Sequence, residues 1–184
     1  MLDVRSLALD GVLEIRPPKF EDSRGYFSEV WSAGRMAEAG LDIPFVQDNH
    51  SMSTARGVLR GLHFQMPPAA QHKLVRVSRG SVFDVAVDIR RESATFGQWA
   101  GAILSVELWN QLLIPPGFAH GFLTLAEHTE VQYKVSAPYR EDLDRAIRFD
   151  DPAIGIEWPM LAGEFILSDK DRNAPVLAAI ETGF

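Results

Sequence analysis

The sequence contains no cysteine, which excludes disulfide bonds and thiolate-bound metals and suits a reducing compartment. It also lacks any apolar run that approaches the ~20 residues needed for a membrane-spanning helix. Residues 1–18 carry Asp3, Asp10 and Glu14 and do not form the continuous apolar segment of a signal peptide. These absences predict a cytoplasmic protein with no membrane partner.

An excess of positive charge is missing too. The formal net charge is −7, and this argues against a nucleic-acid or membrane-surface binder, because both need a basic surface. Any anionic ligand must then be held by a local group of arginines and lysines. The 184 residues, 46% of them hydrophobic, predict a single domain over residues 1–184 with a proper core.

The apolar residues that are present fall into short stretches between glycines and prolines, which is typical of a β-sandwich or barrel. One stretch, Ala33–Ala39, has a helical pattern, and Gly40 follows it as a C-terminal cap. The predicted strands are Val12–Ile15, Tyr26–Trp31, Phe45–Met52, Lys73–Val77, Val82–Ile89, Trp99–Leu104, Gln111–Ile114, Gly121–Leu125 and Val131–Val135.

Side-chain alternation indicates where polar groups point. Lys73 shares a strand face with Val75 and Val77, which suggests a barrel interior, although a strand-end lysine that reaches water fits equally well. A second face carries only polar residues. Such a face is more often solvated than part of a pocket lining. Its members are Gln47, Asn49, Ser51 and Ser53.

Two segments carry a recognisable histidine pattern. Ile114–His120 reads I-P-P-G-F-A-H and resembles the signature P-x-G-x-x-H of the cupins, a family of small β-barrels. Arg60–Gln65 reads R-G-L-H-F-Q and stands where cupins carry their first metal motif, but only His63 and Gln65 are present and the expected glutamate is missing. A catalytic metal generally needs three protein ligands. The resemblance implies a mainly β, cupin-type double-stranded β-helix (jelly-roll) barrel with a few short helices and no metal.

Six motifs follow one another in an order that is specific, although each alone is weak. They are F-x-D-x-R-G-x-F from Phe20, Q-D-N-x-S-x-S from Gln47, V-x-R-G-L-H-x-Q from Val58, Q-x-K-L-V from Gln71, Y-K at Tyr133 with Tyr139, and S-D-K-D from Ser168. Together they resemble the dTDP-4-dehydrorhamnose 3,5-epimerase family from Phe20 to Asp171.

This resemblance implies an enzyme that inverts carbons 3 and 5 of dTDP-4-dehydro-6-deoxy-D-glucose, in dTDP-L-rhamnose biosynthesis, without a cofactor. Both carbons flank a ketone, so removal of either proton gives an enolate. By resemblance His63 is the base, Tyr133 the acid on the opposite side, and Lys73 the cation near the enolate oxygen. An isolated histidine or tyrosine in a strand is more often a core residue; the ordered motifs favour the catalytic interpretation.

A carboxylate should hold the far nitrogen of His63. The position in the S-x-K-D motif favours Asp171, but Asp169 would share its face in a strand, so alternation does not separate the two. Asp84 is a third candidate.

The resemblance also implies the substrate contacts. Arg24 and Arg60 should bind the diphosphate, and Tyr139 should stack on the thymine. Arg60 and His63 have opposite strand parity, so both reach one pocket only if Gly61 bends or bulges the strand. His120 either contacts substrate or fills the barrel. The remaining predicted contacts are Glu29, Gln47, Asp48, Asn49, Asp144 and Lys170.

One stretch departs from the family. Many members read x-P-E-x-E-R after the tyrosine, whereas here the run Arg140–Arg145 lacks the proline and has aspartates for both glutamates. This puts a substrate contact by Asp144 in doubt. The family also implies a homodimer, in which the N-terminal strand region, about residues 1–32, crosses to the partner with Arg24 and Glu29.

Three other functions stay open. A carbon-3-only epimerase of a related deoxysugar pathway would share the base and the acid. A metal-dependent cupin oxygenase or isomerase is disfavoured by the missing ligands. A non-catalytic sugar-binding module would not need His63, Lys73 and Tyr133 together.

Overall fold

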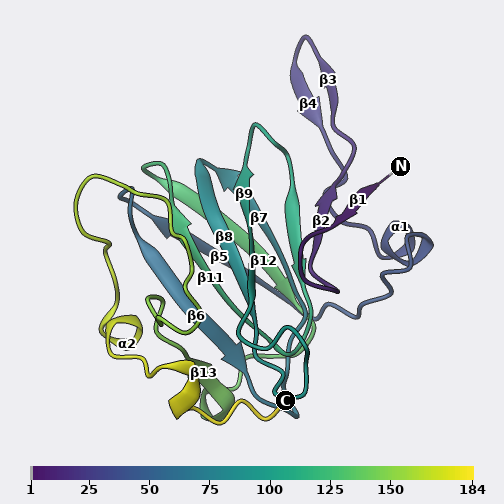
Figure 1. Cartoon of the computed structure of the whole chain (residues 1–184). Helices are drawn as coiled ribbons and strands as arrows, with labels where there is room; N and C mark the ends of the chain where they lie inside the picture. The colour runs from purple at the N-terminus through teal and green to yellow at the C-terminus, as the bar shows by residue number, and fades with distance from the viewer. Residues whose placement is uncertain (1) are drawn as a thin grey trace.

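The computed structural model describes residues 2–184, and it consists mainly of two antiparallel β-sheets that face each other (Figure 1). The six-stranded sheet contains, in spatial order, β1 (Asp3–Ser6), β2 (Leu13–Arg16), β10 (Gln111–Ile114), β7 (Lys73–Arg79), β12 (Thr129–Val135) and β5 (Gln47–Ser53). The five-stranded sheet contains β13 (Asp144–Ala146), β6 (Leu59–Gln65), β11 (Phe118–Thr124), β8 (Ser81–Asp88) and β9 (Trp99–Ser105). The predicted jelly-roll class is confirmed.

The remaining elements are short. A hairpin of β3 (Phe20–Asp22) and β4 (Gly25–Phe27) projects away from the two sheets (Figure 1). The helices are α1 (Ala33–Glu38) and α2 (Asp169–Arg172), with 3-10 turns η1 (Glu141–Leu143) and η2 (Leu177–Ala179). None of the helices within residues 2–184 is long and apolar enough to span a bilayer.

The predicted helix is confirmed to within one residue. It ends at Glu38, Ala39 is its C-cap, and Gly40 follows with a φ of +78°, the left-handed conformation that glycine adopts without strain. The predicted strand Tyr26–Trp31 is wrong beyond Phe27. There the chain leaves the hairpin and runs toward α1, and Trp31 packs against the outer face of the large sheet.

Apolar side chains fill one part of the space between the sheets. Val75, Leu112 and Val131 of the large sheet meet Val82 and Phe122 of the small one there. The other face of each sheet is covered by a terminal segment: α1 and its neighbours pack on the large sheet, and residues 147–184 pack on the small one. The core therefore leaves the rest of the space between the sheets for polar side chains.

Strand β6 is irregular, and this irregularity decides which of its side chains face the inside. It pairs with β11 through His63–His120 and Arg60–Phe122, so three steps on β6 match two on β11. The extra residue falls at Gly61, whose φ is +118°. Arg60 and His63 consequently both line the pocket described below, and the bulge at Gly61 that this arrangement needs is present.

Alanine at position 61 should destabilise the protein strongly. A Cβ there would lie 2.6 Å from the Gly121 Cα and 2.7 Å from the His120 carbonyl oxygen, both backbone atoms that cannot move aside cheaply. Strain at such a φ costs about 1–3 kcal/mol before any clash is added. We expect Gly61→Ala to lower the thermal unfolding midpoint by roughly 10 °C or more.

Gly163→Ala is the matched control, because Gly163 has a φ of +92° and no atom within 4 Å of an added Cβ. Gly163→Ala introduces the backbone strain without a clash, so it should lower the thermal unfolding midpoint much less than Gly61→Ala. Equal losses in the two variants would contradict the close approach of β6 and β11.

Candidate active site

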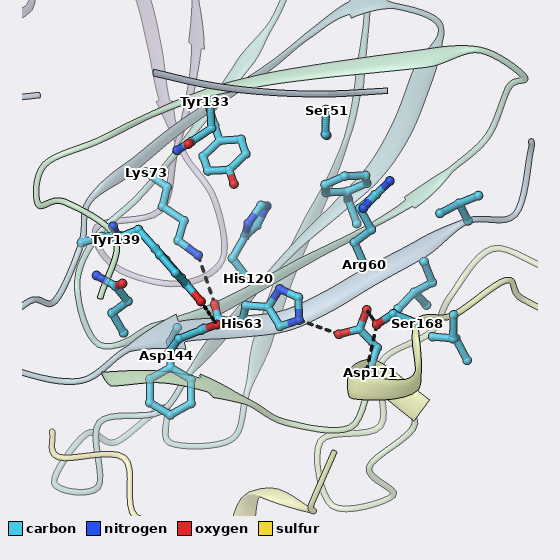
Figure 2. A pocket seen from close by; sticks show the side chains of 18 of the residues that line it. Ser51, Arg60, His63, Lys73, His120, Tyr133, Tyr139, Asp144, Ser168 and Asp171 are labelled. Atoms are coloured by element: carbon cyan, nitrogen blue, oxygen red, sulfur yellow. Dashed lines mark hydrogen bonds and ion pairs between the residues drawn. The ribbon is translucent and has the colours of Figure 1, made fainter. Parts of the chain in front are cut away.

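A pocket of about 520 Å³ lies between the sheets, and it gathers most of the predicted site residues (Figure 2). Four predicted contacts do not line it: Arg24, Glu29, Asp48 and Lys170. The predicted residues that do line it are Gln47, Asn49, Arg60, His63, Lys73, His120, Tyr133, Tyr139, Asp144 and Asp171.

The His63 ring is held by a buried carboxylate. Its Nε2 lies 2.5 Å from Oδ1 of Asp171, while its other ring nitrogen, Nδ1, is left for the pocket (Figure 2). The Ser168 hydroxyl donates to Oδ2 of Asp171 at 2.8 Å and also caps α2. Burial raises the pKa of Asp171, but the hydrogen bonds from His63 and Ser168 outweigh it and hold that pKa below its ordinary value. Asp171 is therefore ionised and Nε2 of His63 is the donor.

The structure shows which of the three candidate carboxylates holds His63. Asp169 and Asp171 lie in a short helix and not in a strand, so residues two apart point to different sides. Asp171 is buried whereas Asp169 is exposed. Asp84 accepts a hydrogen bond from His120 instead, with its two oxygens 2.9 Å and 3.0 Å from Nε2.

Lys73 faces the inside of the barrel, which confirms the first of its two interpretations. It follows the alternation of β7 with Val75 and Val77, and it is only 9% exposed. Its ammonium group donates to the carbonyl oxygen of His63 at 3.1 Å. Burial lowers the pKa of Lys73 to about 8, although the charges of Asp144 and Asp84 raise it. A group that loses its proton near pH 8 is thus placed beside His63.

Tyr133 comes from β12, next to β7, and its hydroxyl points into the space that Lys73 and His63 share (Figure 2). Burial raises the pKa of this phenol above its ordinary value, so it stays protonated at neutral pH. No residue of 2–184 accepts a hydrogen bond from it. The hydroxyl is available to a ligand.

The polar face of β5 lines the pocket, so the more common interpretation, a solvated face, is wrong here. Asn49 and Ser51 stand opposite Tyr133 and Val131 of β12, which face the inside, so they face the inside too, and Gln47 lies on the same face of β5. Asp48 points the other way and forms an ion pair with Lys134 at 2.9 Å. Within one chain the Asp48 side chain does not reach the pocket.

Charged and aromatic side chains form the rim. The Tyr139 hydroxyl donates to Oδ2 of Asp144 at 3.1 Å (Figure 2). Lys170 forms an ion pair with the same carboxylate. The shortened Asp144 thus has two internal partners already. Tyr139 is 56% exposed, which leaves its ring open to a planar group. Arg60 reaches Ser53 Oγ at 3.3 Å.

Of the four predicted contacts outside the pocket, Arg24 and Glu29 belong to the N-terminal segment. Arg24 lies in the turn between β3 and β4, where its side chain is 88% exposed and pairs with Asp22. Glu29 follows β4 and pairs with Arg35 at 2.8 Å. Neither residue is in a strand, so the expectation of an early strand carrying both is wrong.

Gln65 stands at the position where cupins bind a metal, but here its side chain forms hydrogen bonds with the backbone. Its amide nitrogen donates to the Ala69 and Pro138 carbonyls, and its oxygen accepts from the Arg140 backbone. Residues 2–184 contain no cluster of three histidine or acidic side chains that could hold a metal.

Ser168, which holds Asp171, is a site residue that the sequence did not predict. The spacing was a usable signal, because a serine three residues before an aspartate at a helix start is a common capping arrangement.

Comparison with known proteins agrees with this geometry. The family model described as dTDP-4-dehydrorhamnose 3,5-epimerase matches residues 6–179. The dTDP-4-dehydrorhamnose 3,5-epimerase of Sinorhizobium fredii is 50% identical over 180 residues, which cover 98% of this chain and 92% of that protein.

Solved structures agree as well. The dTDP-6-deoxy-D-glucose-3,5-epimerase of Legionella pneumophila, in complex with dTDP-4-keto-L-rhamnose, superimposes with a TM-score of 0.94 at 43% identity, covering 98% of this chain and 95% of that one. A 3'-monoepimerase of Streptomyces bikiniensis, in complex with dTDP-quinovose, is more distant, with a TM-score of 0.88 at 34% identity, covering 95% and 87%. The chain belongs to the dTDP-4-dehydrorhamnose 3,5-epimerase family.

Proposed function

We propose that this enzyme inverts carbons 3 and 5 of dTDP-4-dehydro-6-deoxy-D-glucose and yields dTDP-4-dehydro-L-rhamnose. The observation that carries the proposal is one pocket with a histidine held by Asp171, a buried lysine and a free phenol. The relatives from Sinorhizobium fredii and Legionella pneumophila bear a 3,5-epimerase activity in their names, and the second was solved in complex with dTDP-4-keto-L-rhamnose. The acidic, cysteine-free composition suits a cytoplasmic enzyme.

His63 is the base in this proposal. Because its Nε2–H is donated to ionised Asp171, the lone pair is on Nδ1, toward the pocket. The carboxylate also stabilises the imidazolium that forms when a proton leaves the sugar carbon. A positioned general base of this kind is worth about 10²–10⁴ in rate.

Lys73 and Tyr133 complete the reaction. When His63 removes a proton next to the ketone, negative charge develops on the ketone oxygen, and the Lys73 ammonium stabilises it. Tyr133 then delivers a proton to the same carbon from the opposite side, which inverts the centre. Its raised pKa keeps that proton on the phenol until the enolate carbon accepts it.

The polar rim supplies the nucleotide contacts. Arg60 binds the diphosphate because a guanidinium matches phosphate oxygens. Tyr139 stacks on the thymine, and Gln47 with Asn49 contacts the base or ribose. Lys170 and Asp144 form an ion pair next to Tyr139, whose hydroxyl donates to the same carboxylate.

We also propose a homodimer in which each site receives Arg24 and Glu29 from the partner. Arg24 extends from a projecting hairpin and lies outside its own chain's pocket. The same hairpin exposes Phe20 by 60% and Phe27 by 70%, and a subunit interface would bury such large apolar side chains.

Hydrogen exchange in deuterated water tests the reaction. With the wild type, proton NMR of the 4-keto sugar nucleotide should show deuterium at carbons 3 and 5. His63→Ala should lose about 10³-fold or more of this exchange, because it removes the base and the ring that Asp171 orients. Deuterium at carbon 3 alone would identify a mono-epimerase, and no exchange would identify a binding protein.

Tyr133→Phe separates abstraction from reprotonation in the same experiment. His63 and Lys73 remain in this variant, so deuterium exchange should persist although net epimerisation is lost. If both stop together, Tyr133 does more than deliver the final proton.

The pH dependence should report Lys73. Its protonated form is the active one, so kcat/KM should fall about tenfold per unit as the pH rises past this group's pKa, which burial has lowered to about 8. Lys73→Arg keeps its charge well above that pH, so whatever activity it retains should not show this decline. A flat wild-type profile from about pH 7 to about pH 10 would contradict the role of Lys73.

Mixed dimers test the shared site. Arg24→Ala and His63→Ala subunits should each be inactive alone, yet a heterodimer of the two contains one intact site. Random exchange of equal amounts should therefore restore about a quarter of the wild-type activity. No recovery despite verified exchange, or a monomer by light scattering, would rule out the shared site.

A further inference from the structure

Asp84 is a buried carboxylate for which the proposed reaction has no role. It lies on β8, is 0% exposed, and faces the space between the sheets with Val82 and Ala86. Both of its oxygens are within 3.0 Å of Nε2 of His120. Within residues 2–184 no other group donates a hydrogen bond to it. His120 is therefore its one direct partner.

The burial of this pair favours a charged histidine. An ionised carboxylate away from water is costly unless a positive group compensates it. An imidazolium at His120 compensates it through Nε2–H and leaves a second N–H, on Nδ1, for the pocket that His120 lines. In the sheet His120 is directly opposite His63, so this second donor and the base lie on neighbouring strands.

Asp84 also acts on Lys73. Burial lowers the pKa of Lys73, and the negative charges of Asp144 and Asp84 raise it, whereas Lys170 lowers it further. Without Asp84, two cations would face one buried pocket with less compensation. Besides Lys73 of β7, the charged and titratable groups around this pocket are His63 and Arg60 of β6, Asp84 of β8, His120 of β11, Tyr133 of β12, Tyr139, Asp144 of β13, and Lys170 and Asp171 of α2.

We propose that Asp84 is a positioning residue that holds His120 as an imidazolium and serves as the shared counter-ion of His120 and Lys73. Two cations then face the ketone, and both stabilise the enolate oxygen. The inference rests on the proposed function for its catalytic consequence, but the charge state of His120 is a property of the free protein.

Asp84→Asn keeps the shape and removes the charge. We expect kcat to fall about 10²-fold with little change in KM, and the alkaline fall of kcat/KM to begin at a lower pH, because Lys73 loses a charge that raises its pKa. Asp88→Asn is the matched control. Asp88 is equally buried on the same strand, but it binds Arg90, Ser93 and Thr95 and does not line the pocket.

Asp88→Asn should lower stability and leave the pH profile in place. A merely structural Asp84 would behave in the same way, so an unshifted alkaline limb in Asp84→Asn would overturn the proposal. If that variant does not fold, nitrogen NMR of the wild-type histidine rings decides, with His120 assigned from a His120→Gln variant. Two protonated ring nitrogens at about pH 7 are expected, and a neutral His120 ring would overturn the proposal.

The two hypotheses fail separately. Absence of deuterium exchange in the wild type refutes the epimerase function. The nitrogen NMR of the unliganded protein still judges the charge on His120, because it needs no substrate.

Discussion

The site depends on the backbone contact between β6 and β11. Gly61 and Gly121 bring the two strands so close that a Cβ on either glycine would lie within 3.0 Å of the other strand's backbone. This approach accommodates the extra residue on β6 and turns Arg60 and His63 to the same side. A regular strand would alternate them, and the guanidinium would then leave the pocket.

A second constraint is the division of the space between the sheets. Apolar residues fill one part, and charged groups occupy the other, where water is partly excluded. Two of these charges have close partners: Asp171 has His63 and Ser168, and Asp84 has His120. The positive charge of Lys73 is compensated less completely by its neighbours, and burial therefore lowers its pKa to about 8. A cation buried in this way is the kind that stabilises a developing negative charge well.

Several elements could be predicted because their signals are local. The helix at Ala33 has its own period and its own glycine stop, and β7 shows the alternation that turns Lys73 inward. Strand β6 was not among the predicted strands, since its bulge breaks the period of two. The helix α2 could not be predicted, because four residues carry too little periodicity, and without it the different surroundings of Asp169 and Asp171 could not be predicted either. The polar face of β5 was assigned to solvent because alternation shows which residues share a face, not what that face meets.

The sequence by itself determined the β class, the family through six ordered motifs, and the residue types that proton transfer next to a ketone requires. These features can be predicted from the sequence because they depend on short segments and on the order in which the segments follow one another. Only the tertiary structure decided that Asp171 holds His63, that Asp84 holds His120, and that Arg24 lies outside its own chain's pocket. Asp171 is 108 positions from His63, and the geometry of such a pair is set by how sheets pack and strands shift, which no local pattern encodes.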